Sequence, residues 1–140
     1  FNLLIGESTA EKIKKEIGTA IPTANNVFLM KGRDIRTGTP KEISLTEEDA
    51  CEALMPILSQ MLAAIKEALE STPPELSADL VDMGLVLTGG GALLKNIDKL
   101  ISKDTGLPVT IADNPLECVA IGTGKALENE ELFSTMLSEY

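Results

Sequence analysis

The sequence contains no histidine and no tryptophan among its 140 residues, and it has only two cysteines. Without histidine, these residues can form no Ser-His-Asp triad, no Cys-His nucleophile pair and no imidazole zinc site. Two cysteines cannot build a disulfide scaffold, and Cys51 and Cys118 both stand among small apolar residues, as core thiols do. Hydrolase and zinc chemistries of these kinds are therefore excluded for this stretch of polypeptide.

Basic side chains and long apolar runs are also scarce. There are 12 basic against 22 acidic side chains, a net charge of −10, so we expect no binding to nucleic acid. No apolar run approaches the roughly 20 residues of a membrane-spanning helix, and no signal-peptide pattern is visible. Hydrophobic residues make up 44% of the chain, which predicts a folded, soluble protein of a reducing compartment. The chain begins at Phe1 rather than at a methionine.

Charge is distributed unevenly along the chain. Residues 1–41 hold seven basic and four acidic side chains, a net charge of +3, whereas residues 42–140 hold five basic and 18 acidic side chains, a net charge of −13. One interpretation is ordinary solvated surface with a chance imbalance. The other is a pair of oppositely charged lobes that attract each other head to tail between copies of the chain.

The first third of the chain predicts a small α+β unit. The apolar spacing indicates a helix over residues 8–20, with Ser8 or Thr9 as its N-cap. Residues 27–31 predict a strand, and residues 42–45 a short partner strand. A long helix then begins at the N-cap Thr46, carries a continuous apolar stripe and includes Pro56, where we expect a kink.

The rest of the chain alternates strands and helices. A short helix over residues 74–80 leads into two apolar strands, at residues 84–88 and 108–112, which we expect to be parallel and buried on both faces. A helix over residues 92–103 connects these strands. Further helices are predicted from Pro115 to about Glu128 and over about residues 130–137.

Three consecutive glycines mark a strand-to-helix junction within residues 87–94 (LTGGGALL). A tight turn needs fewer glycines, so we interpret the run as a backbone that lets a ligand approach closely. The dinucleotide fingerprint does not fit, because Leu94 stands where its last glycine belongs. Residues 119–126 resemble a phosphate-binding loop but lack its first glycine and its Ser/Thr, so close helix packing is the better interpretation of Gly122 and Gly124.

The other polar pattern lies in the first predicted helix. Glu11 and Lys14 are three residues apart and share a helix face. Taken alone, this spacing indicates an exposed ion pair of small energetic value. No pair of carboxylates is marked as catalytic by its position.

These two motifs belong to a longer set of stretches: residues 1–18 (FNLLIGESTAEKIKKEIG), 31–36 (KGRDIR), 73–79 (PPELSAD), 84–94 (GLVLTGGGALL) and 113–127 (DNPLECVAIGTGKAL). In this order they closely resemble the C-terminal part of the MreB/Mbl family of bacterial actin-like rod-shape proteins. The PPELSAD and TGGGALL stretches together argue against other actin-fold ATPases, such as plasmid-segregating filaments or chaperones.

The resemblance implies an α/β, actin-like (ribonuclease H-like) ATPase fold, present in part. Residues 1–45 would form the small α+β subdomain IIB, and residues 46–140 the C-terminal part of subdomain IIA. The chain would carry the adenosine side of an ATP pocket, with no catalytic residue and no metal ligand. The residues implied to bind the nucleotide are Glu11, Lys12, Ile13, Lys14, Gly89, Gly90, Gly91, Ala92 and Leu93.

The family's phosphate loops and water-orienting residues would precede Phe1, so we expect magnesium to bind mainly there and this fragment alone to be an inactive ATPase. Three strands of the IIA sheet would also precede Phe1, and we therefore expect the isolated chain to self-associate.

The implied function is that of a filament subunit that organises cell-wall synthesis and maintains rod shape. The implied partners are other copies of the chain, a RodZ-like membrane protein and the cell-wall elongation machinery. The implied location is cytoplasmic and membrane-associated as a filament, with membrane contact only through parts absent here. The alternative is a protein-interaction module that docks a RodZ-type partner and has no nucleotide binding of its own.

Overall fold

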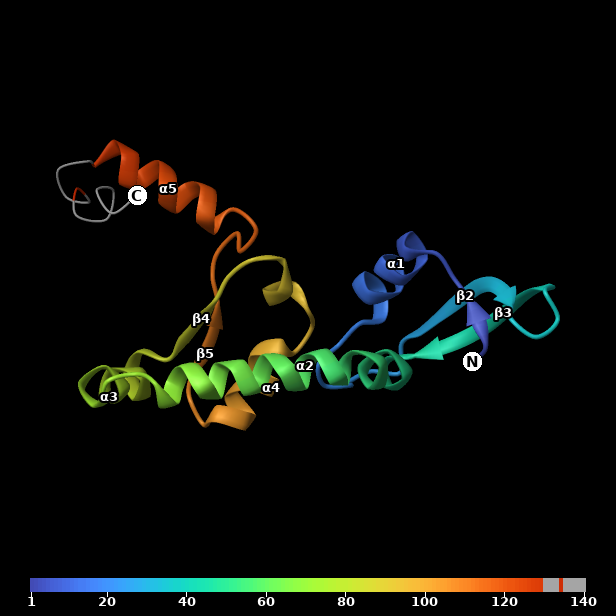
Figure 1. The fold of residues 1–140 in the computed structure, drawn as a ribbon, viewed down its shortest axis with the longest axis horizontal. Helices are drawn as coiled ribbons and strands as arrows, with labels where there is room; N and C mark the ends of the chain where they lie inside the picture. The colour runs from blue at the N-terminus through green and yellow to red at the C-terminus, as the bar shows by residue number, and fades with distance from the viewer. Residues whose placement is uncertain (130–133, 135–140) are drawn as a thin grey trace.

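The computed structural model describes residues 1–129 and Ser134, and it consists of two lobes joined by one long helix (Figure 1). The three-stranded lobe contains β1 (Leu3–Leu4), α1 (Glu7–Ile17), β2 (Val27–Asp34) and β3 (Pro40–Thr46). The joining helix is α2 (Glu47–Glu70). The two-stranded lobe contains α3 (Pro74–Met83), β4 (Leu85–Leu87), the 3₁₀ turn η1 (Gly90–Leu93), α4 (Ile97–Thr105), β5 (Val109–Ile111) and α5 (Cys118–Glu128).

The three-stranded lobe is an antiparallel sheet in the order β1-β2-β3, covered by α1. Pairing runs from Val27 opposite Thr46 to Arg33 opposite Pro40, so both strands are longer than predicted. Because side chains alternate along β2, Met30 points into a core that also receives Ile13 from α1. This lobe therefore closes its own hydrophobic core.

Helix α1 begins at Glu7, one residue before the predicted start, and Gly6 is its N-cap. The prediction of Ser8 or Thr9 as N-cap was wrong, because both residues lie inside the first turn. The helix ends at Gly18, where an added Cβ would stand 2.2 Å from the carbonyl oxygen of Lys14. Glycine is therefore required at the point where the chain leaves α1.

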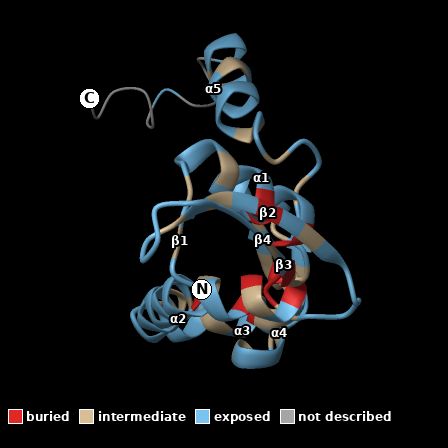
Figure 2. Ribbon diagram, turned by 90° about the vertical axis from the view of Figure 1, so that its right-hand side faces the viewer, coloured by how far each residue is buried: buried red, intermediate tan, exposed pale blue. Residues whose placement is uncertain are grey.

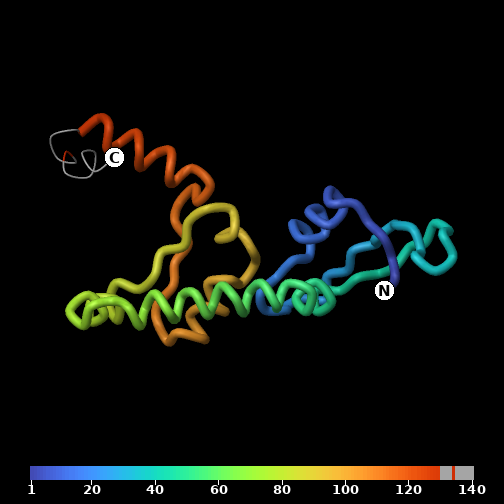
Figure 3. The backbone as a smooth tube through the Cα atoms, in the orientation of Figure 1, coloured from blue at the N-terminus to red at the C-terminus, as the bar shows by residue number. Residues whose placement is uncertain are grey.

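Helix α2 confirms the predicted start at Thr46. The Thr46 hydroxyl accepts a hydrogen bond from the Asp49 N–H, and the Asp49 carboxylate accepts one from the Thr46 N–H, which forms a capping box. The helix continues through Pro56 to Glu70 without interruption. Figure 3 shows it running past both lobes, so its two ends belong to different cores.

The two-stranded lobe contains the predicted parallel pair, with Leu85 opposite Val109 and Leu87 opposite Ile111. The prediction that these strands are buried on both faces was wrong. The side opposite α4 is open, and Val86 is 62% exposed. Figure 2 shows that few segments are buried and that most of the ribbon is exposed or intermediate. The core of this lobe combines Ala20, Leu58, Ile97 and Ile101.

Helix α3 starts at Pro74 as predicted, whereas α4 and α5 start later than predicted. The helix predicted over residues 92–103 is divided into η1 and α4, and Leu93 points outward rather than into the core. Helix α5 begins at Cys118 rather than at Pro115, because a turn with Asn114 at φ 48° comes first. The glycines of α5 do not serve close packing among the described residues, since a Cβ at Gly122 would meet nothing within 4 Å.

Three further predictions concern the cysteines, the last helix and the membrane. Cys51 is buried as expected, whereas Cys118 is only partly buried. The helix predicted over about residues 130–137 lies outside the described residues, Ser134 apart. Within residues 1–129, no helix combines the length and apolarity needed to cross a membrane.

Candidate functional site

A cavity of about 650 Å³ lies between the two lobes, with α1 on one side and the glycine-rich turn on the other. Helix α2 forms its floor. The lining residues are Glu11, Lys14, Lys15, Gly18, Leu54, Ile57, Leu58, Met61, Gly90, Gly91, Leu93, Leu94, Lys95, Ile97 and Leu116.

The glycine-rich turn forms one wall of the cavity, which we call the glycine wall. It begins directly after the end of β4. Gly89 has φ 78° and ψ 176°, a conformation that is essentially confined to glycine. Its N–H donates to the Pro115 carbonyl oxygen at 2.7 Å, which fixes the turn beside the start of α5. A Cβ at Gly90 would meet the Leu116 side chain at 3.3 Å, whereas one at Gly91 would meet nothing within 4 Å. The turn thus presents bare backbone to the cavity.

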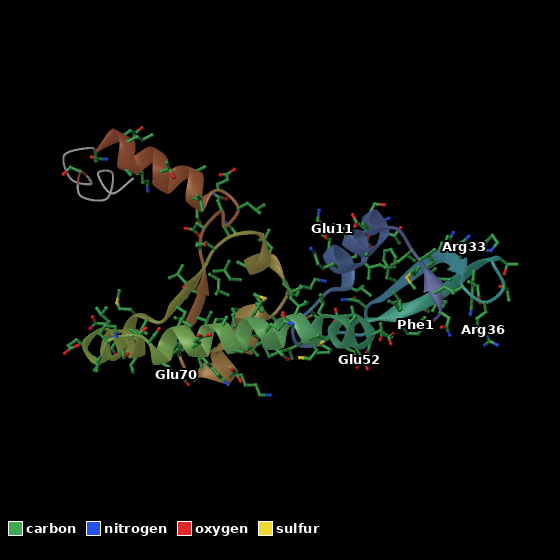
Figure 4. All side chains as sticks on the ribbon, viewed as in Figure 1. Phe1, Glu11, Arg33, Arg36, Glu52 and Glu70 are labelled. Atoms are coloured by element: carbon green, nitrogen blue, oxygen red, sulfur yellow. The ribbon has the colours of Figure 1, made fainter. Side chains whose placement is uncertain are left out.

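The facing wall is the polar side of α1. The Lys14 Nζ lies 2.6 Å from a Glu11 carboxylate oxygen, and the Lys15 Nζ lies 3.8 Å from the other. The hydrogen bond from Lys14 lowers the pKa of Glu11, so this carboxylate is ionised at neutral pH. Figure 4 shows Glu11 on the side of α1 that faces the two-stranded lobe. The wall therefore offers a charged acceptor and a charged donor to a ligand.

The structure brings five of the nine predicted site residues to this one cavity. They are Glu11, Lys14, Gly90, Gly91 and Leu93. Helix α1 and the glycine-rich turn, which are about 75 residues apart in the sequence, thus face each other across this cavity. Spacing alone indicated only an exposed ion pair for Glu11 and Lys14, whereas the structure places them opposite the glycine turn across one cavity.

The other four predicted residues do not line the cavity. Lys12 lies 5.8 Å from the centre of the Phe28 ring, on another side of α1. Ile13 is part of the core of the three-stranded lobe, and Ala92 is buried beneath the glycine turn. Gly89 acts through its backbone conformation, which shapes the turn.

The sequence analysis missed the apolar part of the site. Leu54, Ile57 and Met61 come from α2, and Leu116 comes from the turn before α5. The apolar stripe of α2 was the available signal, because Ile57 lies on it and is 57% exposed. A stripe that serves only the core would not leave so much of this side chain exposed.

These residues do not form a metal site. Within residues 1–129, no group of three or more histidine, cysteine, aspartate or glutamate side chains could hold an ion. Glu11 is the single carboxylate among the lining residues of the cavity. The residues present therefore do not fit a magnesium-binding role, although they fit the uncharged part of a nucleotide.

Comparison with known proteins places this arrangement in a family. The family model described as MreB/Mbl protein matches residues 1–135. The cell shape-determining protein Mbl of Bacillus cereus is 50% identical over 130 residues, which cover 92% of this chain and 39% of that protein. The cell shape-determining protein MreB of Escherichia coli is 47% identical over 129 residues, which cover 91% of this chain and 37% of that protein. The chain thus spans about two fifths of the length of these relatives.

Solved structures agree with the sequence comparison. The structure of MreB5 of Spiroplasma citri bound to AMPPNP matches with a TM-score of 0.88 and 37% identity, covering 93% of this chain and 39% of that one. A MamK double helical filament matches with a TM-score of 0.61 and 25% identity, covering 82% of this chain and 35% of that one. The predicted actin-like fold, present in part, is confirmed. The chain belongs to the MreB/Mbl family.

Proposed function

We propose that this chain supplies the adenosine side of an ATP site in an actin-like filament subunit that organises cell-wall synthesis and maintains rod cell shape. The observation that carries the proposal is the cavity in which the Glu11–Lys14 pair faces Gly90 and Gly91. In support, the two MreB5 structures that this chain resembles were solved with AMPPNP and with ADP bound.

The chemistry of the cavity suits an adenosine. The Glu11 carboxylate accepts hydrogen bonds from ribose hydroxyls, and the methylene stem of Lys14 covers one face of the base. Gly90 and Gly91 have no side chains, so the base and sugar can approach the backbone closely. Ile57 and Leu116 provide apolar contacts for the base.

ATP hydrolysis itself is not assigned to these residues. Lys14 lowers the pKa of Glu11 and so weakens it as a base, and in this proposal Glu11 lies on the adenosine side, away from water at a γ-phosphate. Magnesium and the triphosphate require groups from other parts of a family-length protein. We therefore expect this chain alone to bind the nucleotide weakly and not to hydrolyse it.

The test compares Gly90→Val with Gly122→Ala in two settings. One is the 140-residue chain, and the other is a family-length chimaera in which this chain replaces the matching 130 residues of Bacillus cereus Mbl. A valine at Gly90 meets Leu116 and fills the cavity, so fluorescent ATP should bind at least about tenfold more weakly. Gly122→Ala lies in open space on α5 and should leave the affinity unchanged. Unchanged ATP affinity of the chimaera carrying Gly90→Val would contradict the assignment.

Self-assembly is the second part of the proposal. Residues 1–41 carry a net charge of +3 and residues 42–140 a net charge of −13. Figure 4 places Arg33 and Arg36 at the outer end of the three-stranded lobe and Glu70 at the opposite end of the molecule. Opposite charges at opposite ends favour head-to-tail order between subunits. The polymer yield of the chimaera should therefore fall as salt rises, and a yield independent of salt would oppose an electrostatic role.

The remaining partners follow from the family. In this proposal the filament lies in the cytoplasm at the membrane and acts with a RodZ-like membrane protein and the cell-wall elongation machinery. The alternative function is docking of the RodZ-type helix-turn-helix domain without nucleotide binding, which the acidic charge of residues 42–140 favours. Separate titrations of the chain with that domain and with ATP distinguish the two functions.

A further inference from the structure

The end of α1 is tied to the segment that follows η1. Thr19 is completely buried and forms an isolated parallel β-bridge with Lys95. The Ala20 N–H donates to the Lys95 carbonyl oxygen at 2.8 Å, and the Lys95 Nζ donates to the Glu16 carbonyl oxygen at 2.8 Å. Residues 75 positions apart in the sequence are thus held in register by backbone hydrogen bonds.

Asn96 adds side-chain contacts to this junction. Its backbone is left-handed, with φ 60° and ψ 16°, a conformation that asparagine tolerates better than most residues. From this position its Nδ2 donates to the Ile21 carbonyl oxygen at 2.9 Å and to the Thr19 Oγ1 at 3.2 Å. The Thr19 hydroxyl in turn donates to the Ile21 carbonyl oxygen at 2.7 Å.

The same segment is held from the other side by α2. Glu47 is 3% exposed, and its carboxylate accepts hydrogen bonds from the Thr23 N–H at 3.2 Å and the Ala24 N–H at 3.1 Å. The Asn26 Nδ2 donates to its second oxygen at 2.7 Å. We call residues 19–26, with their partners Lys95, Asn96 and Glu47, the clamp.

The clamp lies at one end of the candidate nucleotide cavity. Gly18 and Lys95 line the cavity, and they are the chain neighbours of Thr19 and Asn96. The two walls of the cavity, the polar side of α1 and the glycine-rich turn, therefore both extend from this junction. Their separation depends on this junction, where Thr19 and Asn96 add side-chain hydrogen bonds to the backbone bond between Ala20 and Lys95 and to the bond from the Lys95 Nζ to Glu16.

We propose that Thr19 and Asn96 are positioning residues of the nucleotide site, whose hydrogen bonds set the separation of α1 from the glycine-rich turn. Neither side chain lines the cavity, so each acts on the ligand through Lys14 and Gly91. The proposal rests on the proposed function, since the ligand is taken to be ATP. An adenosine that contacts both walls at once loses affinity when the separation varies.

The affinity test uses Thr19→Val, which keeps the shape of the side chain and removes the hydroxyl. In the chimaera, Thr19→Val should weaken ATP binding about tenfold, and Asn96→Gly should do the same while keeping the left-handed backbone. Thr19→Ser restores the hydroxyl and should bind ATP within about threefold of the unaltered protein. Ile101→Val is the matched control, because it disturbs the core of the same lobe without removing any hydrogen bond of the clamp and should lower the melting temperature but not the affinity.

A distance measurement tests the clamp without nucleotide. Spin labels are placed at Lys12→Cys on α1 and Lys99→Cys on α4, in the 140-residue chain with Cys118→Ser. Labelled chain is diluted with unlabelled chain so that only distances within one molecule are recorded. The distance distribution should be narrow in this background, broad with Thr19→Val and narrow again with Thr19→Ser.

The two readouts separate failure of the clamp from failure of the proposed function. A narrow distribution with Thr19→Val overturns the positioning role, whatever the ATP affinity. Where the unaltered chimaera binds ATP, an equal affinity in Thr19→Val also overturns it. If the unaltered chimaera binds no ATP while Thr19→Val still broadens the distribution, the clamp stands and the proposed function falls.

Discussion

The two lobes differ in how their strands are paired. In the three-stranded lobe a central strand, β2, has partners on both sides, and α1 covers one face of the sheet around Met30 and Leu45. In the two-stranded lobe both strands are edges, and Val86 and Val119 are more than half exposed. A sheet of two strands is marginal without further packing. Both lobes share a core with α2, through Ala50 in the first and Leu58 in the second, so the second lobe is the weaker one because neither of its strands has a partner on both sides.

The largest expected effect comes from breaking the two-stranded lobe at Gly84. This glycine has φ 72° and ψ −163°, and an added Cβ would stand 2.3 Å from the Pro108 carbonyl oxygen. Because the Leu85 N–H donates to this same carbonyl oxygen, Gly84→Ala should cost at least about 3 kcal/mol in urea unfolding and should remove hydrogen-exchange protection from β4 and β5.

Gly38→Ala is the control in the three-stranded lobe. Gly38 also has a positive φ, 74°, but an added Cβ there would meet nothing within 4 Å. The conformational penalty alone should cost about 1–2 kcal/mol. If Gly84→Ala were as mild as Gly38→Ala, the close contact with Pro108 would not limit the lobe.

The second prediction concerns self-association through the open sheet. Val86 lies on an edge strand of the two-stranded lobe, so its apolar side chain and unpaired backbone are both available to another copy. In light scattering the chain should exceed its monomer mass of 14.9 kDa, and Val86→Lys should return it toward that mass.

Leu29→Lys provides the matched control for Val86→Lys. Leu29 is 60% exposed, which is close to the 62% of Val86, but it lies on the central strand β2, where no free edge is present. It should therefore change association less. A monodisperse monomer with a cooperative melt in the unaltered chain would contradict the contrast drawn between the lobes.

The third prediction uses pH to loosen the junction between the lobes. Hydrogen bonds from Asn26 and from the backbone N–H groups of Ala24 and Thr23 lower the pKa of Glu47. A carboxylate whose pKa is lower in the folded state stabilises the protein above its unfolded pKa, about 4.3, and loses this contribution as pH falls through the folded value. Stability should therefore fall with acidification below about pH 5.

Glu47→Gln isolates this contribution from that of other carboxylates. The variant should melt several degrees lower at pH 7, and the difference from the unaltered chain should shrink as pH falls from 5 to 3. Thermal melts at half-unit pH intervals measure it. A constant difference across that range would mean that the charge of Glu47 does not stabilise the junction.

The smallest effect is expected on the outer face of the three-stranded lobe. Lys31 and Glu42 are directly opposite in the sheet, and the Lys31 Nζ lies 3.3 Å from the carboxylate. Both side chains are well exposed, so Lys31→Ala should cost less than about 1 kcal/mol at low salt and close to nothing at 1 M salt. A larger or salt-independent cost would show that this face matters to the lobe beyond its surface charges.

Local patterns in the sequence predicted much of this fold. Thr46 followed by Asp49 three residues later specified the start of α2, because the two residues satisfy each other's backbone within one turn. The parallel pairing of β4 and β5 followed from the strand-helix-strand order. Gly106 is likewise a local signal for the end of α4, where it takes the left-handed conformation at φ 74°.

The errors arose where distant contacts decide the local structure. A continuous helix was predicted through Asn96, whose amide instead contacts residues 19–23, more than 70 positions away. The start of α5 was misplaced because the Pro115 carbonyl receives a hydrogen bond from Gly89. No local pattern in the sequence indicated the three hydrogen bonds between Glu47 and the preceding loop.

In the candidate site, too, local patterns predicted one part, and distant contacts decide the other. The glycine run was recognisable because three consecutive glycines exceed what a turn requires. The role of Glu11 and Lys14 could not be obtained from their spacing, since an exposed pair of this kind is common on helices. Their place opposite Gly91 depends on the tertiary fold, and only the resemblance to the family indicated it before the structure did.

Helix α2 supplies Ala50 to one core and Leu58 to the other. An α-helix advances about 1.5 Å and turns about 100° per residue. Inserting one residue between these positions would rotate one lobe relative to the other by more than a quarter turn, whereas an insertion in the hairpin loop between β2 and β3 would displace only the loop. The number of residues in this part of α2 therefore fixes the rotation of one lobe relative to the other. We expect insertions there to abolish nucleotide binding even when both ends remain helical.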